Sequence, residues 1–359
     1  MESLLPFKRV LVAGAGGWLG RRLVDVLANG MADDERFSSP RPGLAIRALV
    51  LPGEDASALR QLGSGVEVVT GDIRNAADCQ RFCADAAGGL LIQAAGVIHP
   101  PKVSDFYAVN LQGTKNLLEA AVAAGLKRAV VVSSNSPIGC NPTRGHLFDE
   151  NSPYHPYMNY GRSKMLMELA VKEIQQAGKI ETVIVRPPWF YGPYQPPRQG
   201  LFFRMIRDGK APIVGDGGNL RSMAYIDNLC QGLLLAGSVA EAAGNIYWIA
   251  DRRPYSMNEI MDTIENLLEN EFKVPCAHKR MRLPSIASTV ARMFDKNLQM
   301  LGLYHQKIHV LSEMNQNIAC SVQKAEAELG YRPTVELEEG MRRSLQWMKQ
   351  TGQDELFRT

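Results

Sequence analysis

The sequence predicts an α/β fold in which a doubly wound parallel sheet carries a smaller, mostly helical C-terminal lobe. Short apolar runs alternate with helical patterns from residue 9 to residue 250. Strands this continuously apolar are buried on both faces, and their alternation with helices implies right-handed crossovers and a parallel sheet. With 359 residues, of which 45% are hydrophobic, the chain is long enough for a large core and two lobes.

The apolar runs and helical patterns give the order of the elements. We expect strands over 9–13, 44–51, 66–70, 89–95, 128–134, 181–187 and 245–250, and helices over 18–29, 76–86, 104–124, 157–177 and 227–238. Five prolines between 187 and 197 mark where the chain leaves the sheet. We therefore assign residues 1–187 and 224–250 to the sheet domain. Residues 188–223 and 251–359 form the smaller lobe over the carboxyl edge of the sheet, where ligands of open α/β folds bind, which makes it a substrate lobe.

A glycine turn follows the first strand. Residues 8–20 read Lys-Arg-Val-Leu-Val-Ala-Gly-Ala-Gly-Gly-Trp-Leu-Gly, an apolar strand that breaks into glycines before a helix. Gly14 permits a tight turn, Gly17 lets the backbone approach phosphates, and Gly20 lets the helix pack against the strand. The helix N-terminus then supplies N–H groups and a partial positive charge. The pattern predicts a Rossmann-type dinucleotide-binding domain, although glycines at this spacing are a weak signal on their own.

A tyrosine and a lysine lie four residues apart in Tyr160-Gly-Arg-Ser-Lys164, on one face of the helix expected over 157–177. Proton transfer to or from a carbinol oxygen needs a group that titrates near neutral pH, whereas a free tyrosine has a pKa of about 10. An ammonium one helical turn away, together with a cationic oxidised nicotinamide, favours the phenolate. We therefore expect Tyr160 to be the acid/base and Lys164 to lower its pKa and hold the nicotinamide ribose.

These motifs follow one another in a fixed order, and from about residue 8 to at least residue 250 the chain resembles the extended short-chain dehydrogenase/reductase superfamily. This group contains nucleotide-sugar epimerases and 3β-hydroxysteroid dehydrogenase-like enzymes. The resemblance implies an enzyme that works by hydride transfer with NAD or NADP. It also implies cofactor contacts: Asp72 with the adenine, Ala94 and Ala95 beneath the ribose, and Asn110 as a brace of the active site. Aligned with the pattern of the superfamily, Ser134 stands at the catalytic position, where it would orient the substrate oxygen, with Ser133 as the alternative.

The end of the second strand bears on the choice of dinucleotide. An acidic residue there would bind the ribose 2′-hydroxyl, while an arginine would pair with a 2′-phosphate. Residues 51–55 read Leu-Pro-Gly-Glu-Asp, which places Glu54 nearby and no arginine. We therefore expect NAD, and Arg47 with the Arg21–Arg22 pair keeps NADP open.

The residues after the catalytic serine narrow the reaction. Sugar-nucleotide 4,6-dehydratases of the superfamily carry an Asp-Glu pair directly after the catalytic hydroxyl residue, because elimination needs a further acid and base. Asn135 and Ser136 stand at these positions here. We expect neither dehydration nor carboxylate-assisted decarboxylation, which leaves oxidation, reduction or epimerisation.

Three residues are candidates for substrate binding: Arg221, Trp189 and Ser136. The segment 210–228 resembles the stretch of nucleotide-sugar epimerases in which an arginine clamps the substrate diphosphate, and the bidentate fork of Arg221 suits that role. A salt bridge at the lobe interface is the structural alternative for Arg221. Trp189 stands where sugar-nucleotide enzymes usually carry an asparagine, and with Phe190 it would line an apolar pocket.

The first functional hypothesis is therefore a sugar-nucleotide epimerase or oxidoreductase whose substrate is a nucleotide-linked sugar. The alternative is a 3β-hydroxysteroid-type or other hydrophobic-alcohol dehydrogenase or ketone reductase. A third hypothesis, a non-catalytic dinucleotide sensor, conflicts with the intact set of Ser134, Tyr160 and Lys164, because a sensor does not need the phenol.

Composition excludes several other classes. A net charge of +3 without a basic run argues against nucleic acid, and no stretch of 18 apolar residues could span a membrane. Six scattered cysteines are expected as reduced thiols, with no metal site. We expect a cytoplasmic homodimer in which helices 104–124 and 157–177 pair across a twofold axis. Their exposed faces would carry Leu111, Leu117, Leu118, Met165 and Met167.

Overall fold

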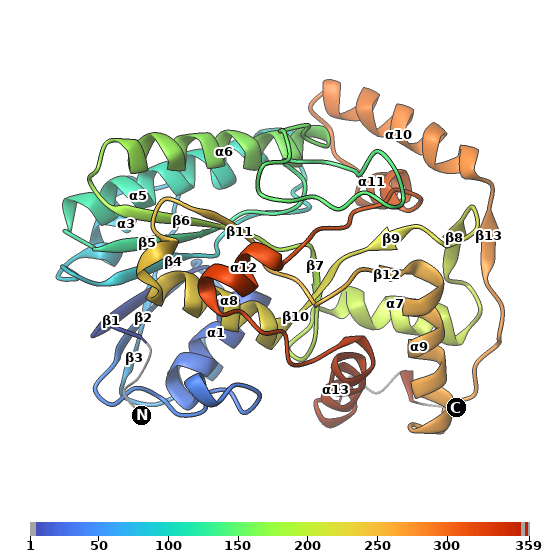
Figure 1. Cartoon of the computed structure of the whole chain (residues 1–359), viewed down its shortest axis with the longest axis horizontal. Helices are drawn as coiled ribbons and strands as arrows, with labels where there is room; N and C mark the ends of the chain where they lie inside the picture. Colours follow the sequence, from blue (N-terminus) through green and yellow to red (C-terminus); the bar gives the residue numbers. More distant parts are fainter. Residues whose placement is uncertain (1–4, 353–355, 358–359) are drawn as a thin grey trace.

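The computed structural model describes residues 5–352 and 356–357, and a seven-stranded parallel sheet forms its centre (Figure 1). The strand order is β11-β6-β5-β4-β1-β2-β3. The sheet contains β1 (Arg9–Ala13), β2 (Ala45–Val50), β3 (Val66–Thr70), β4 (Leu90–Gln93), β5 (Arg128–Val132), β6 (Glu181–Arg186) and β11 (Ile246–Trp248). The order reverses between β1 and β4, so the carboxyl ends of these two strands bound the crevice in which doubly wound folds bind ligands.

Helices cover both faces of the sheet. On one face α1 (Trp18–Asn29), α2 (Ser57–Arg60) and α8 (Ile226–Ser238) bury apolar side chains against Val10 and Val12. On the other face α3 (Ala76–Cys83), α5 (Thr114–Ala123) and α6 (Met158–Gln176) pack on Leu11 and Ala13. Alternate residues of β1 thus face opposite helical layers, which confirms the predicted Rossmann-type domain.

The helix expected over 104–124 is interrupted. Its first turn is α4 (Val103–Asp105), a π-helix η2 (Phe106–Gly113) follows, and α5 completes it. The wider π turn contains the predicted brace, Asn110. Such turns are rare and occur often at functional sites, and sequence periodicity cannot distinguish them from an α-helix.

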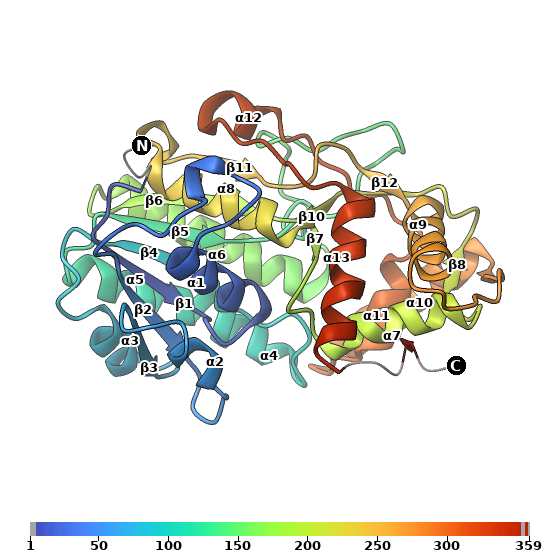
Figure 2. The same ribbon diagram turned by 90° about the horizontal axis from the view of Figure 1, so that it is seen from below.

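The smaller lobe combines short strand pairs with helices (Figure 2). Its strands pair as β7 (Trp189–Tyr191) with β10 (Met223–Tyr225), β8 (Pro212–Val214) with β13 (Met281–Leu283), and β9 (Leu220–Arg221) with β12 (Tyr255–Ser256). The helices of residues 188–359 are α7 (Pro197–Arg207), α9 (Met257–Asn270), α10 (Ser285–Met300), α11 (Gln306–Glu313), α12 (Gln323–Leu329) and α13 (Leu337–Gln350), of which α12 packs on α8 and β11 of the sheet domain. Two 3₁₀ turns, η1 (Glu35–Phe37) and η3 (Ala240–Ala242), lie in the sheet domain.

One segment of the expected substrate lobe lies on the sheet domain. After α12 the chain runs beside α8, where Asn228 Nδ2 donates to the carbonyl of Val335 at 2.7 Å and Gln231 Nε2 donates to that of Arg332 at 2.9 Å. The assignment of 251–359 to one lobe stays a prediction, and this segment joins the two parts of the molecule.

The apolar stripe expected at a dimer interface is absent from the surface. Leu117, Leu118 and Met167 are buried, because they form the layer between the sheet and helices α3, α5 and α6. Leu111 and Met165 are half-buried. The expectation that these five side chains are exposed is wrong, and the homodimer stays a prediction without that support.

The buried carboxyl of Asp251 joins the two parts of the molecule behind β11. It accepts hydrogen bonds from the Tyr225 backbone N–H at 2.9 Å, the Tyr191 hydroxyl at 2.8 Å, and Asn228 Nδ2 at 3.0 Å. Burial raises the pKa of Asp251 from 3.8 to about 7, although these donors act to lower it. The folded protein therefore holds a proton that the unfolded chain releases near pH 4.

Asp251 should make the stability of the protein depend on pH. Between about pH 4 and pH 7 the folded state binds the extra proton, so this group contributes stability at low pH that is lost as the pH rises through about 7. Asp251→Asn removes that contribution. Chemical denaturation should show a larger stability advantage of the wild type over the variant at pH 5 than at pH 8. An advantage equal at both pH values would contradict the assignment.

Candidate active site

The glycine turn lies at the reversal of strand order, against the end of β4. Gly14 has a positive φ of 80°, and a Cβ built on it would lie 2.6 Å from the Ala95 nitrogen. A Cβ on Gly20 would lie 2.1 Å from the Gly14 carbonyl oxygen, whereas one on Gly17 would lie 3.4 Å from that oxygen, an ordinary contact. Gly14 and Gly20 are therefore required by the protein's own packing. Gly17 leaves space at the start of α1 that the fold does not need.

Glu54 lies against the glycine turn. A Cβ built on Gly16 would lie 2.2 Å from Glu54 Oε2, an oxygen that also accepts a hydrogen bond from the Leu51 N–H at 3.0 Å. A carboxylate here suits a ribose 2′-hydroxyl and repels a 2′-phosphate. Two of the three arginines that could pair with the 2′-phosphate of NADP are engaged in other ion pairs: Arg47 binds Glu67, and Arg22 binds Asp227.

The other predicted cofactor residues lie at the same edge of the sheet. Ala94 and Ala95 follow β4 beside Gly14. The carboxyl of Asp72 follows β3 and pairs with the Arg74 guanidinium, which lowers the pKa of Asp72. Asn110 is fully buried: its side-chain oxygen accepts from the Val97 N–H at 2.9 Å, and its nitrogen donates to Ser163 Oγ at 3.1 Å. Asn110 thus fixes the loop after β4 against α6.

The structure brings Ser134, Tyr160 and Lys164 together. Tyr160 and Lys164 lie one turn apart on α6, and the buried ammonium of Lys164 donates to the Val132 carbonyl oxygen at 3.0 Å. Ser134 lies two residues after β5, and its hydroxyl acts to lower the pKa of the Tyr160 phenol. The Tyr160 ring lies 5.8 Å, centroid to centroid, from that of Phe106. A carbinol oxygen placed between the two hydroxyls could exchange a proton with Tyr160.

Burial has the largest effect on the pKa values of Tyr160 and Lys164. Burial raises the pKa of Tyr160 to about 12, against the Ser134 hydrogen bond, and the charge of Glu313 raises it further. Burial also lowers the pKa of Lys164 to about 8, although Glu168 acts to raise it. Lys164 is not among the groups that shift the pKa of Tyr160 in the protein alone, so the expectation that Lys164 and a cationic nicotinamide lower it stays a prediction.

A buried ion pair between Glu168 and Arg186 lies beneath the site and was not predicted from the sequence. Glu168 of α6 accepts from Arg186 at the end of β6 at 3.0 and 2.6 Å, from the Ser133 hydroxyl at 2.5 Å, and from the Tyr154 hydroxyl at 2.8 Å. The Ser133 hydroxyl is thus engaged with Glu168, which leaves Ser134 as the serine that faces Tyr160. These four residues are distant in sequence, so no local pattern could have indicated the cluster.

Aromatic and imidazole rings close the site from the side of the smaller lobe. The Tyr304 ring contacts Phe106 edge-on at 5.4 Å, and its hydroxyl lies 2.7 Å from His99 Nδ1. Burial lowers the pKa of His99 to about 4, so this ring is neutral at physiological pH. His309 lies 5.4 Å from the Tyr304 ring. The segment between α10 and α11 therefore contributes a wall of the site.

The three substrate candidates occupy different positions. Ser136 is buried beside Ser134, and its backbone oxygen accepts from the Tyr157 N–H at 3.0 Å. Trp189 is 37% exposed and its ring contacts Phe202 at 5.8 Å. The Arg221 guanidinium donates through one terminal nitrogen to the backbone oxygen of Glu313. Its Nε is buried and has no hydrogen-bond partner among the residues that the structure describes.

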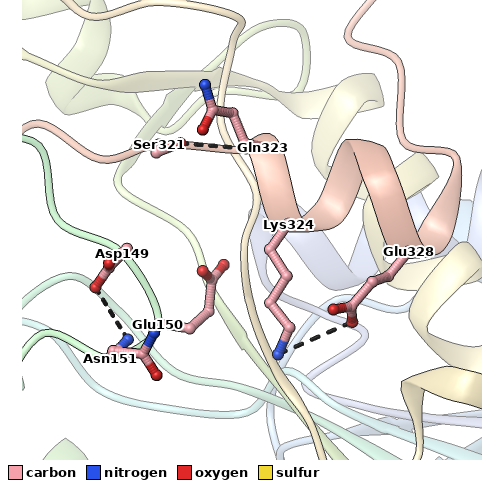
Figure 3. A pocket seen from close by; sticks show the side chains of 7 residues that line it. All are labelled: Asp149, Glu150, Asn151, Ser321, Gln323, Lys324 and Glu328. Atoms are coloured by element: carbon pink, nitrogen blue, oxygen red, sulfur yellow. Dashed lines mark hydrogen bonds and ion pairs between the residues drawn. The ribbon is translucent and has the colours of Figure 1, made fainter.

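Two cavities open elsewhere on the surface. One of about 450 Å³ lies between the 149–151 loop and α12, where Glu150 and Lys324 face each other and none of the predicted site residues takes part (Figure 3). The other, of about 480 Å³, lies between the start of α6 and α10, and one of the residues that line it, Asn159, directly precedes Tyr160 in the sequence. In the part of the chain that the structure describes, no cluster of side chains could hold a metal ion.

Comparison with known proteins agrees with the site. The model of the NAD dependent epimerase/dehydratase family matches residues 10–250. The uncharacterized protein y4nL of Sinorhizobium fredii is 50% identical over 345 residues, 96% of each chain. The 3β-hydroxysteroid-dehydrogenase/decarboxylase isoform 1 of Arabidopsis thaliana is 27% identical and covers 96% of this chain and 80% of its own. Among solved structures, the dTDP-glucose 4,6-dehydratase DesIV of Streptomyces venezuelae, crystallised with NAD, superposes with a TM-score of 0.73 at 25% identity, over 98% of this chain and all of its own.

The glycine turn makes a test with an internal control. Gly17→Val should abolish binding of NAD and leave the melting temperature within a few degrees of the wild type, since its methyl groups occupy only the space at the start of α1. Gly20→Val should destabilise the protein, because its Cβ collides with the Gly14 carbonyl. Calorimetric titration with NAD and thermal denaturation measure the two effects. Unchanged NAD affinity in Gly17→Val would mean that the turn is only structural.

Proposed function

We propose a reaction for a chain that belongs to the NAD dependent epimerase/dehydratase family and uses NAD as its cofactor. The reaction is hydride transfer between NAD and the carbon of a secondary alcohol or ketone, and an apolar molecule carries that group. The observation that supports it is the position of the Ser134 hydroxyl beside Tyr160, one helical turn from Lys164 and at the sheet edge that carries the glycine turn. A homodimer and a cytoplasmic location remain predictions from the sequence.

Each residue of the set has a separate task. Ser134 donates to the substrate oxygen and orients it, and Tyr160 gives or takes the proton of that oxygen. NAD accepts or supplies the hydride, and its oxidised ring adds a positive charge that favours the Tyr160 phenolate. Lys164, whose pKa of about 8 leaves it mostly protonated at neutral pH, would bind the ribose hydroxyls near Asn110. Gly14, Gly17 and Glu54 would hold the pyrophosphate and the adenosine ribose.

The surroundings of Tyr160 favour an apolar substrate. Phe106 and Tyr304 form a continuous aromatic wall, and the neutral ring of His99 lies against Tyr304. Arg221, the expected diphosphate clamp, donates instead through Nη2 to the backbone oxygen of Glu313 at the end of α11. A relative that matches most of this chain is named as a 3β-hydroxysteroid dehydrogenase.

A nucleotide-linked sugar remains the second candidate, because one observation favours it. Arg221 Nε is buried without a partner among the described residues, and an unpaired buried donor of a charged group is costly. A diphosphate that displaced the Glu313 carbonyl would satisfy both nitrogens. From the sequence alone, the nucleotide-linked sugar is the first candidate. The contact of Arg221 with the Glu313 carbonyl at the end of α11 favours the apolar substrate instead.

Tyr160→Phe tests the proposed chemistry. The variant lacks the hydroxyl that exchanges the proton, so NADH formation with a 3β-hydroxysterol should fall roughly a hundredfold or more, while NAD still binds. Tyr157→Phe is the matched control. Tyr157 lies three residues before Tyr160, and its hydroxyl is 2.7 Å from Ser312 Oγ, so the variant should retain activity. Absorbance of NADH and calorimetric NAD binding report the two steps. Turnover that survives Tyr160→Phe would overturn the choice of acid/base.

Nucleoside diphosphate binding decides between the two substrate classes. For an apolar substrate, calorimetry should detect no binding of UDP, GDP, CDP or TDP to the wild type. A clamp would instead give measurable binding that Arg221→Ala weakens by well over tenfold, since a charge-assisted contact is worth on the order of 2 kcal/mol. NAD affinity should be the same in both proteins under either hypothesis. Diphosphate binding of this kind would make the sugar nucleotide the substrate.

A further inference from the structure

The helix α10 carries its apolar side chains on the outside. Ser288, Ala291, Asp295 and Gln299 are its buried residues. The opposite face carries five exposed apolar side chains, with exposed fractions from 43% to 68%: Ile286, Val290, Met293, Phe294 and Met300. In Figure 1 this helix lies at the upper edge of the molecule, above α11 and away from the sheet. A helix on the surface of a water-soluble domain normally has the reverse arrangement.

Polar contacts fix α10 in this orientation. Ser288 Oγ donates to the Leu311 and Ser312 carbonyls at 2.9 Å each, and Asp295 lies 2.7 Å from His309 Nδ1 of α11. Gln299 Nε2 donates to Asp295 at 2.9 Å. Rotating the helix to bury its apolar face would leave these buried polar groups without partners, which is costly. The outward apolar face is therefore a property of the fold.

The apolar surface continues into the connection between α10 and α11. Leu301 is 76% exposed and Leu303 is 54% exposed. Leu303 forms a bridge with Lys102, in the loop that carries His99. The next residue, Tyr304, is the one whose ring contacts Phe106 in the site. The exposed apolar surface thus ends at a wall of the active site.

The charges around this face have one sign. Between 281 and 310 the chain has four Lys or Arg residues and one Asp, a net charge of +3 that equals the formal net charge of the whole protein. Arg282, Arg292, Lys296 and Lys307 are exposed, whereas Asp295 is buried against His309. Arg292 and Lys296 lie one turn apart on a flank of the apolar face. Apolar residues flanked by cations are the pattern of helices that lie in the surface of an anionic bilayer.

The cavity beside α10 has the same charge preference. Arg162 of α6 and Lys296 of α10 both line this space of about 480 Å³, together with the amides of Asn159 and Gln299. None of the described residues lining it is a carboxylate. The two amides are occupied, since Asn159 Nδ2 donates to Gln299 Oε1 at 3.0 Å and Gln299 Nε2 to Asp295, so the two cations are the groups that suit a phosphate.

We propose that α10 and the 301–303 connection dock into the surface of a bilayer that contains anionic phospholipids. The outer apolar face enters the acyl boundary, and Arg162, Arg292 and Lys296 bind headgroup phosphates. The mode is one of lying on the membrane, since no helix of the described chain is long and apolar enough to cross it. The docking goes beyond the proposed reaction and does not depend on it. It places the wall formed by Tyr304 at the lipid surface.

Vesicle sedimentation tests the docking with the full chain. The wild type should sediment with vesicles of phosphatidylcholine and phosphatidylglycerol, and much less with phosphatidylcholine alone. Phe294→Ser should weaken binding by about tenfold, since a large exposed apolar side chain is lost. Leu147→Ser, which replaces another exposed apolar residue far from α10 in sequence, should bind like the wild type. Arg292→Gln/Lys296→Gln should weaken binding by at least about tenfold, since each cation contributes roughly fivefold.

Three results would overturn the proposal. These are no sedimentation of the wild type with anionic vesicles, binding that Phe294→Ser leaves unchanged, and binding equal on neutral and anionic vesicles. Sedimentation velocity of the same variants identifies the competing occupant: a wild-type dimer that Phe294→Ser converts to a monomer, without vesicle binding, would make a second copy the partner of α10. NAD binding of each variant confirms its folding, and failure of the docking leaves the Tyr160→Phe test untouched.

Discussion

The buried ion pair between Glu168 and Arg186 determines where the reacting groups stand. Glu168 lies on α6, one turn beyond Lys164, and its two oxygens accept from Arg186 and from the Ser133 and Tyr154 hydroxyls. The pair therefore joins α6 to the ends of β5 and β6. These bonds offset only part of the cost of desolvating two charges, because Arg186 Nη1 is buried without a hydrogen-bond partner among the described residues, and removal of either partner would leave a buried charge. The Glu168 carboxylate also raises the pKa of Lys164 and so opposes the decrease in that pKa that burial causes.

The sequence was sufficient for features that local pattern controls. Strands β1 to β6 are mostly apolar, and β4 is buried throughout, so their limits agree with the expected ranges to within two residues. The glycine turn was equally predictable, since Gly14 and Gly20 are required by backbone contacts a few residues away or at the end of a neighbouring strand. The positions of Tyr160 and Lys164 follow from helical spacing, and Ser134 from the end of β5.

Features that depend on distant contacts were not predictable. The protonation of Tyr160 depends on its burial beneath Phe106, and the accessibility of Arg221 depends on Glu313, almost a hundred residues later. Leu117 and Leu118 form an apolar stripe in the sequence, and the stripe looks the same whether a neighbouring subunit or the chain's own sheet covers it. The π-helix around Asn110 has no sequence signature of its own. In each case the outcome is decided by a partner that the local sequence does not name.

The orientation of α10 connects these points. Its sequence has an ordinary amphipathic pattern, and periodicity alone would place Met293 and Phe294 in the core. The His309 ring reverses this, because it draws Asp295 inward and holds the apolar face in solvent. His309 also lies beside Tyr304, which contacts the site. The His309 ring therefore takes part in two features: it holds Asp295 inward, which leaves the apolar face of α10 exposed, and it contacts Tyr304 in the wall of the site. A partner bound to α10 would lie next to that wall.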